Sequence, residues 1–185
     1  MAMVPVETSA RHVHVSRADL DVLFGTGYQL INKKDLSQPG QFACRERVQV
    51  VGPRGELTCT ILGAERPDTQ VELSVTDARA IGITAPLRES GDIANTPGAT
   101  IVGTQGTVIL TQGVIVAKRH IHMTPIDAQH IGVADKQIVG VQLAGPRGVT
   151  FHQTVVRVST RFAMALHIDT DEANAAGGAV IGEIV

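Results

Sequence analysis

An internal repeat limits the folds that this chain of 185 residues can adopt. The segment Arg11–His14 reads R-H-V-H and returns as R-H-I-H at Arg119–His122, 108 residues further on (119 minus 11). The sequence G-P-R-G occurs at Gly52–Gly55 and again at Gly145–Gly148, with an offset of 93 (145 minus 52). Two marks repeated in the same order predict a duplicated structural unit, so the fold has to hold two copies of one arrangement.

A third, weaker correspondence pairs Arg66 and Glu72 in the first half with Arg161 and His167 in the second. In each pair the arginine stands six positions before its partner. The first copy has 15 more residues between its R-H-x-H motif and its G-P-R-G motif than the second copy (108 minus 93). We place these extra residues within residues 28–47. Each half then supplies R-H-x-H, a G-P-R-G turn and one further polar position, which favours one ligand set per half.

Most apolar stretches are short, rich in Val, Ile and Thr, and separated by Gly and Pro, as at 48–51, 107–110 and 154–158. This pattern predicts many short strands. Ser16 can cap a short helix over 17–23, Thr124-Pro125 another to about Ile131, and a third helix is expected from about Thr170 to Ala175. The fold class is therefore mainly β with small helices, and barrels or sandwiches are its natural closed forms.

Four of the seven histidines form the two His-x-His pairs. In a strand, residues i and i+2 point to the same face, so each pair presents two imidazoles at a spacing that suits one metal ion. One such pair alone would more often be two half-exposed strand positions, but its recurrence favours metal binding. The repeat nominates Glu72 and His167 as third ligands, whereas His130 and His152 have no counterpart and are interpreted as structural or surface residues.

Three protein ligands leave a metal site open to water or substrate, so two open zinc sites are expected. Such sites support hydrolysis, acyl transfer and related chemistry, and the residues alone do not choose among them. Several arginines lie in or beside the motifs and indicate a substrate with phosphate or carboxylate groups; they are Arg11, Arg66, Arg88, Arg119 and Arg161. Arg66 is singled out because it opens the segment that ends in Glu72.

Composition excludes several classes of function. The formal net charge is −2 and aromatic residues make up 3% of the chain, so it lacks the basic field and the stacking side chains of nucleic-acid binders. Cys44 and Cys59 form no C-x-x-C pattern, which favours a reducing cytoplasm. No apolar run approaches the length of a membrane span, and the first residues do not have the layout of a signal peptide.

Five segments together resemble one known family. They are R-H-V-H-V-S at 11–16, L-S-Q-P-G-Q-F-A at 36–43, R-P-D-T-Q-V-E-L-S at 66–74, K-R-H-I-H-M at 118–123 and H-I-D-T-D-E-A-N at 167–174. In this order they are similar to the PduL-type phosphotransacylases, also called phosphate propanoyltransferases. The resemblance implies two interleaved β-barrel domains with short capping helices: residues 11–117 form one, and residues 1–10 plus 118–185 form the other.

The resemblance also implies the reaction, the reversible exchange of acyl-CoA and phosphate for acyl phosphate and coenzyme A, with a propanoyl or acetyl group. It implies two zinc ions per chain, held by His12, His14 and Glu72 and by His120, His122 and His167. Arg66 would orient phosphate for attack on the thioester, and Ser90 and Asn174 would contact coenzyme A or phosphate. A homodimer or larger homo-oligomer is expected.

Two alternatives remain open at this point. A zinc-dependent hydrolase of thioesters or phosphoesters would use the same open sites with water as nucleophile, and a zinc-stabilised binding module would have no turnover. Family members housed in bacterial microcompartments carry an amphipathic N-terminal helix, but only ten residues precede Arg11 and Pro5 interrupts them. We therefore expect the protein to work in the cytoplasm, without a nucleic-acid or membrane partner.

Overall fold

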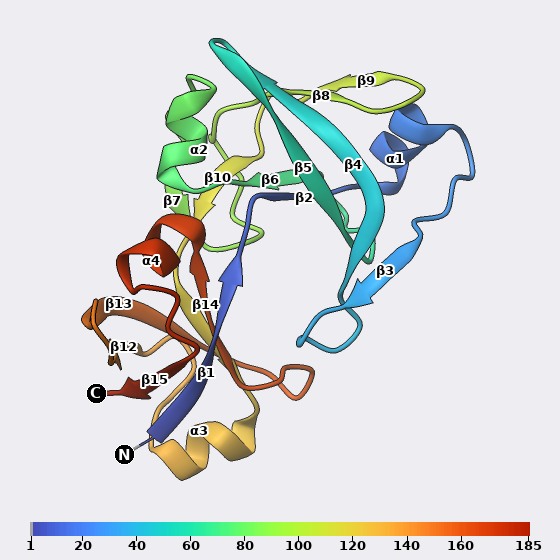
Figure 1. Ribbon diagram of the computed structural model, residues 1–185. Coiled ribbons are helices and arrows are strands. Elements are labelled where there is room, and N and C mark those ends of the chain that lie inside the picture. Colours follow the sequence, from blue (N-terminus) through green and yellow to red (C-terminus); the bar gives the residue numbers. More distant parts are fainter. Residues whose placement is uncertain (1) are drawn as a thin grey trace. The chain divides into compact units, whose positions relative to one another are not determined.

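The computed structural model describes residues 2–185, which divide into two compact units (Figure 1). The sheet unit holds Arg11–Leu36 and Gly40–Ala117, and the barrel unit holds residues 2–10, Ser37–Pro39 and Lys118–Val185. Each unit has its own hydrophobic core. Fifteen strands and four short helices in the described residues confirm the mainly β class.

The sheet unit is built on one curled sheet of nine strands, with the order β7-β10-β6-β2-β5-β4-β8-β9 and with β3 paired to β4. The strands are β2 (His12–His14), β3 (Asn32–Asp35), β4 (Phe42–Gly52), β5 (Gly55–Gly63), β6 (Gln70–Glu72), β7 (Leu87–Arg88), β8 (Thr100–Val102), β9 (Thr107–Ile109) and β10 (Val114–Ala117). Its helices are α1 (Arg17–Phe24) and α2 (Val75–Ala80). The long hairpin of β4 and β5 carries the strongest bend of the sheet (Figure 1).

The barrel unit is a closed barrel of six strands in the order β1-β14-β11-β13-β12-β15. The strands are β1 (Ala2–Ser9), β11 (His120–Met123), β12 (Ile138–Leu143), β13 (Val149–Val158), β14 (Ala165–Asp169) and β15 (Ile181–Ile184), and the helices are α3 (Pro125–Ile131) and α4 (Thr170–Ala175). The first strand runs parallel to β14 and antiparallel to β15, so the two ends of the chain build one barrel. The predicted interleaving is confirmed.

The internal repeat is visible in both units. Each G-P-R-G sequence joins two antiparallel strands, β4 to β5 in the sheet unit and β12 to β13 in the barrel unit. The arginine before each His-x-His pair forms an ion pair with the acidic residue in the first turn of a helix: Arg11 with Asp77 at 3.0 Å and Arg119 with Glu172 at 2.6 Å. The two halves therefore share this ion pair and this hairpin as well as their sequence motifs.

Hydrogen-bonded caps explain the short helices. Ser16, Thr124 and Asp169 each accept a bond from the backbone N–H three residues on, which supplies a partner to one of the donors left over at a helix start. The helices predicted from the sequence are confirmed. The fourth helix, α2, was missed, although Ser74 caps it in the same way by accepting from the N–H of Asp77. None of the described helices is long and apolar enough to cross a membrane.

The strand β11 shows how core and site share one segment. Ile121 and Met123 are fully buried and belong to the core of the barrel unit. The side chains of His120 and His122 alternate with them, and therefore point to the other side of the strand. One face of this strand packs into the hydrophobic core, and the other face presents the two candidate metal ligands.

Removal of the Ile121 side chain should destabilise the barrel unit. We expect Ile121→Ala to lower the free energy of unfolding by about 2–5 kcal/mol, because it leaves a cavity in the core. Ile126→Ala is the matched control, since Ile126 is 66% exposed and its loss should change stability by less than about 0.5 kcal/mol. Urea unfolding followed by circular dichroism measures both, and equal effects would contradict this placement of the core.

Candidate metal centre

The first group of predicted ligands is assembled by two short antiparallel strands of the sheet unit. In the pairing of β2 with β6, His12 lies opposite Glu72 and His14 lies opposite Gln70. Paired residues point to the same face of a sheet, so both histidines and Glu72 share one face. The residues between them, Val13 and Val71, point to the other face and are buried in the core.

The ligand atoms of this group converge. The Nε2 atoms of His12 and His14 lie 3.2 Å apart, and Glu72 places Oε2 at 3.5 Å from the first and Oε1 at 3.7 Å from the second. Bonds of about 2.0–2.1 Å to a tetrahedral zinc would require ligand atoms about 3.3 Å apart. All three side chains are buried, and their ligand atoms all lie within 4.8 Å of one another. The residues present therefore fit a metal ion.

The ionisation of the group also suits a metal. Burial lowers the pKa of His14 well below its usual range, with a further contribution from His12, so its imidazole is neutral. Burial by itself would raise the pKa of Glu72, but His12, His14 and a hydrogen bond from Ser90 outweigh it and hold that pKa well below its usual range. A neutral imidazole and an ionised carboxylate are the forms in which these side chains bind metal.

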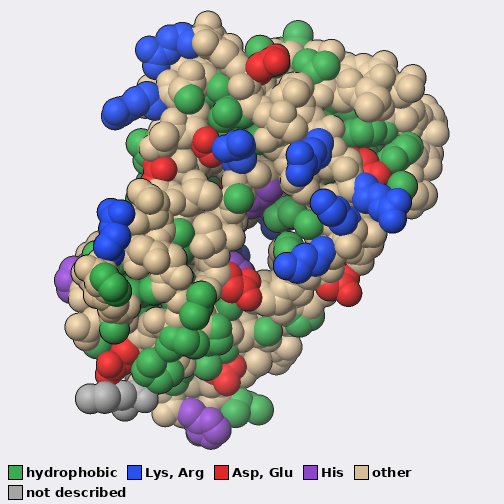
Figure 2. All heavy atoms as spheres, in the orientation of Figure 1, with side chains coloured by type: hydrophobic (Ala, Val, Ile, Leu, Met, Phe, Trp, Pro, Cys, Tyr) green, Lys and Arg blue, Asp and Glu red, His purple; other side chains and the backbone are tan. Residues whose placement is uncertain are grey.

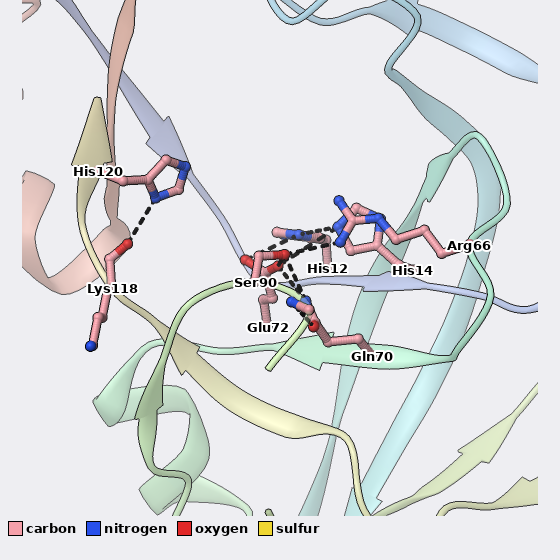
Figure 3. Close-up of polar contacts among 9 residues, drawn as sticks. His12, His14, Arg66, Gln70, Glu72, Ser90, Lys118 and His120 are labelled. Carbon is pink, nitrogen blue, oxygen red and sulfur yellow. Dashed lines mark hydrogen bonds and ion pairs between the residues drawn. The ribbon is translucent and has the colours of Figure 1, made fainter. Parts of the chain in front are cut away.

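The carboxylate of Glu72 is held by two donors on the same oxygen (Figure 3). Gln70 Nε2 donates to Glu72 Oε1 at 2.6 Å, and Ser90 Oγ donates to the same atom at 2.7 Å. Gln70 is itself fixed, because its Oε1 accepts a bond of 2.7 Å from the backbone N–H of Gly91. One carboxylate oxygen is thus oriented by protein groups, while the other, Oε2, faces His12.

Arg66 joins this network from a neighbouring loop. Its backbone N–H donates to the carbonyl of Val15 at 2.9 Å, and its Nη1 donates to Ser90 Oγ at 2.9 Å. Figure 3 shows the side chain of Arg66 beside His14, and its positive charge is one of the causes that lower the pKa of that histidine. A permanent cation therefore lies within the polar network around the candidate ligands.

The second predicted group is gathered in the barrel unit by the equivalent strands. In the pairing of β11 with β14, His120 lies opposite His167 and His122 lies opposite Ala165. The three imidazole centroids are 4.6 to 5.3 Å apart. Burial lowers the pKa of His122, with further lowering by the other two histidines, and its Nδ1 has no hydrogen-bond partner within residues 2–185.

The two groups differ in how closely they are assembled. Among the described residues, the group whose ligand atoms all converge is His12, His14 and Glu72. In the barrel unit, the rings of His120 and His167 are stacked, and His120 directs Nδ1 to the carbonyl of Lys118 at 2.8 Å. The structure thus brings all six predicted ligands into two sets of three, with the tighter set in the sheet unit.

Other predicted positions have different surroundings. Asn174 is exposed on α4, and its side chain makes no hydrogen bond to another of the described residues. His130 and His152 are exposed, as expected for histidines without a repeat counterpart. Sequence reasoning missed Gln70, although a polar residue two positions before Glu72 on a short strand shares its face and could have been recognised as a neighbour.

Comparison with known proteins identifies the family. The sequence model of the phosphate propanoyltransferases matches residues 5–179 of this chain. The chain belongs to that family. Proteins named phosphate propanoyltransferase from Enterococcus faecalis, Listeria monocytogenes and Thermotoga maritima are 56%, 53% and 51% identical to it. These alignments cover 93%, 94% and 92% of this chain, respectively, and 82% of each relative.

The two cysteines of this phosphate propanoyltransferase family member are poorly suited to act as nucleophiles. Cys44 and Cys59 are buried and unpaired in the core of the sheet unit. Burial is the largest cause that raises the pKa of Cys44 to about 11 and that of Cys59 to about 12. The reactive form of cysteine is the thiolate, so both side chains are unreactive near neutral pH.

Alkylation tests this assignment. At pH 8, iodoacetamide should modify neither Cys44 nor Cys59 in the folded protein, because both thiols are buried and protonated. Both should react after unfolding in urea, which serves as the internal control. Mass spectrometry counts the added groups, and rapid modification of either thiol in the folded protein would contradict the assignment.

Proposed function

We propose that the chain is a phosphate acyltransferase that catalyses acyl-CoA + phosphate = acyl phosphate + coenzyme A for a propanoyl or acetyl group. Its family membership supports the reaction class. The observation that carries the proposal is the convergence of three metal-binding side chains with Arg66 in one hydrogen-bonded network. Such a network combines an open metal position with a cation suited to phosphate.

We propose that His12, His14 and Glu72 hold one zinc ion, and that His120, His122 and His167 hold a second. Nitrogen and carboxylate ligands of this kind suit zinc, although other divalent metals also bind them. When bound, zinc would act as a Lewis acid toward the thioester and the departing sulfur. The close approach of Nε2 of His12, Nε2 of His14 and the Glu72 carboxylate supports the first assignment, because buried polar groups this close together are costly without a cation between them.

Arg66 supplies the phosphate-orienting group in this proposal. A guanidinium presents five N–H donors in one plane, so the bond to Ser90 can fix its orientation while it binds an anion. A phosphate oxygen held in this way attacks the thioester carbonyl carbon, a C–O bond forms, the C–S bond breaks, and coenzyme A leaves as the thiolate. Positioning of the two reactants accounts for much of the expected acceleration.

Direct transfer is favoured over an acyl-enzyme. The buried, protonated thiols of Cys44 and Cys59 offer no nucleophile. Ser90 donates its hydroxyl proton to Glu72 and accepts a bond from Arg66, which is the role of a positioning residue. Contacts of Ser90 and Asn174 with coenzyme A or phosphate stay a prediction.

We further propose a homodimer or larger homo-oligomer that works in the cytoplasm. Exposed apolar side chains lie close together on two paired strands of the barrel unit: Met3 on β1 and Ile181 on β15 are 54% and 47% exposed. Figure 2 shows hydrophobic side chains gathered over part of this unit. An apolar patch of this kind is typical of a protein–protein contact surface.

Metal content tests the ligand assignment. The wild type should retain two zinc ions per chain after dialysis, and Glu72→Gln should lose the ion of the sheet unit, because the anionic ligand is removed. We expect the affinity of that site to fall by at least about 100-fold, since even residues that only support a ligand contribute about 10- to 100-fold. His130→Ala is the control, and metal analysis that finds equal content in all three proteins would refute the assignment.

Phosphate dependence tests the reaction. Free thiol should be released from propanoyl-CoA and acetyl-CoA only when phosphate is present. Arg66→Ala should lower kcat/KM for phosphate by about 10²–10³-fold, the usual loss for one group that stabilises transition-state charge. The exposed Arg79→Ala serves as the control variant. Equal thiol release without phosphate would instead identify a thioesterase.

A further inference from the structure

The loop that carries Arg66 is joined to helix α1 by contacts that the proposed mechanism does not use. The loop comprises residues 64–69, which connect β5 to β6 in the sheet unit. The backbone N–H of Arg66 donates to the carbonyl of Val15 at 2.9 Å and fixes one point of the loop. A single hydrogen bond leaves the loop free to tilt, so the contacts on either side of Arg66 determine where its guanidinium lies.

Thr69 is the buried contact, three positions after Arg66. It is 5% exposed. Its hydroxyl oxygen accepts a bond of 2.9 Å from the backbone N–H of Ser16, and its hydroxyl proton is donated to the carboxylate of Asp19. One side chain thus joins the loop to the cap and to the first turn of α1. Removal of the hydroxyl would take this partner from both groups, which is costly away from water.

A second contact lies one position before Arg66. Arg17 Nη1 donates to Glu65 Oε1 at 2.9 Å, and Arg17 Nη2 donates to Asp21 Oδ1 at 2.6 Å. The ion pair with Glu65 is partly exposed, so it contributes less than a buried contact. Together with Thr69, it holds the loop to α1 on both sides of Arg66.

The second copy of the repeat lacks both contacts. The offset of 108 places Pro125 at the position of Arg17 (17 plus 108). The offset of 95, which is 161 minus 66, places Met164 at the position of Thr69 (69 plus 95). Proline has no charge and methionine has no hydroxyl, so neither side chain can make the equivalent bond.

The arginine of the second copy has different surroundings. Arg161 is exposed, and its side chain makes no hydrogen bond or ion pair with another of residues 2–185. Asp127, the counterpart of Asp19, accepts bonds of 2.9 and 2.7 Å from the N–H and the hydroxyl of Thr124 within its own cap. The contacts between helix and loop therefore occur in the copy whose arginine belongs to the polar network around the candidate ligands.

We propose that α1 positions Arg66, and that Thr69 and Arg17 are the positioning residues that join its loop to the helix. Contacts on both sides prevent the loop from tilting about the bond to Val15, so the guanidinium stays against Ser90. A misplacement of about 1 Å in a group that orients a substrate can cost about 100-fold in rate. The catalytic consequence rests on the proposed function, whereas the order of the loop does not.

The test compares Thr69→Val, Thr69→Ser and Arg17→Met, and combines the first with Arg66→Ala. Valine keeps the shape of threonine without its hydroxyl, and serine keeps the hydroxyl. Methionine keeps much of the apolar stem of Arg17 without the charge. Thr107→Val and Arg79→Met are the matched controls, because both of these side chains are exposed.

Two measurements are made on each protein. Thiol release at varied phosphate and propanoyl-CoA concentrations gives kcat and a KM for each substrate. Hydrogen–deuterium exchange of the resting protein, read by mass spectrometry, reports how often residues 64–69 open and requires no turnover. Zinc content and melting temperature are recorded for the same samples.

We expect Thr69→Val to lower kcat/KM for phosphate by about 10- to 100-fold, with zinc content and the KM for propanoyl-CoA unchanged. Thr69→Ser should retain the wild-type value. Arg17→Met should lower it by about two- to fivefold, because a partly exposed ion pair contributes little. In the Arg66→Ala background, Thr69→Val should cost less than about twofold more, since its effect passes through Arg66. Exchange in residues 64–69 should be faster in Thr69→Val and in Arg17→Met.

A purely structural role would give different results. An equal loss from Thr69→Val with and without the Arg66 side chain, or unchanged exchange of residues 64–69 in both variants, would overturn the proposal. If Thr69→Val does not fold, Arg17→Met provides the same comparison at a partly exposed position. If exchange rises as expected but wild-type thiol release is independent of phosphate, the proposed function fails while the positioning of the loop stands.

Discussion

The structure depends on the two-residue period of a strand, applied at the antiparallel pairs β2–β6 and β11–β14. The period sends Val13 and Ile121 into the two cores and the flanking histidines to the opposite face. The partner strand adds a third polar side chain in register, Glu72 in one unit and His167 in the other. A shift of one residue in either pair would bury the imidazoles in the core and expose the valines or isoleucines, so core packing and ligand geometry enforce the same register.

Polar groups buried at this density require compensation. In the sheet unit, Gln70 and Ser90 each donate to one oxygen of Glu72 and Arg66 extends the network, while Nε2 of His12 and Nε2 of His14 face each other at 3.2 Å beside that carboxylate. A buried carboxylate and two imidazoles this close together are costly as structure alone, because they are removed from water. The arrangement becomes reasonable when a cation lies between them.

The sequence predicted much of this arrangement from local signals. The repeated R-H-x-H motif identified both histidine pairs, alignment of the halves nominated Glu72 and His167, and cap residues located three of the four helices. It did not predict α2, although that helix has the length of α4 and a cap of the same kind at Ser74. The hydrogen bond between the side chain of Gln38 and the carbonyl of Ala163 could not be predicted either. It joins residues 125 positions apart, and no local pattern specifies the fold that brings them together.

The interleaving of the two ends of the chain has a consequence for how the molecule can form. The strand β1 pairs with β14 and β15, so β1 cannot form these hydrogen bonds until residues more than 150 positions later in the sequence have been synthesised. Residues 37–39 wait in the same way for residue 163. Contacts between such distant positions slow folding, because the chain loses entropy before the contacts repay it. By the same pairing, residues 118–185 made without residues 2–10 would lack the strand that lies between β14 and β15 and closes the barrel.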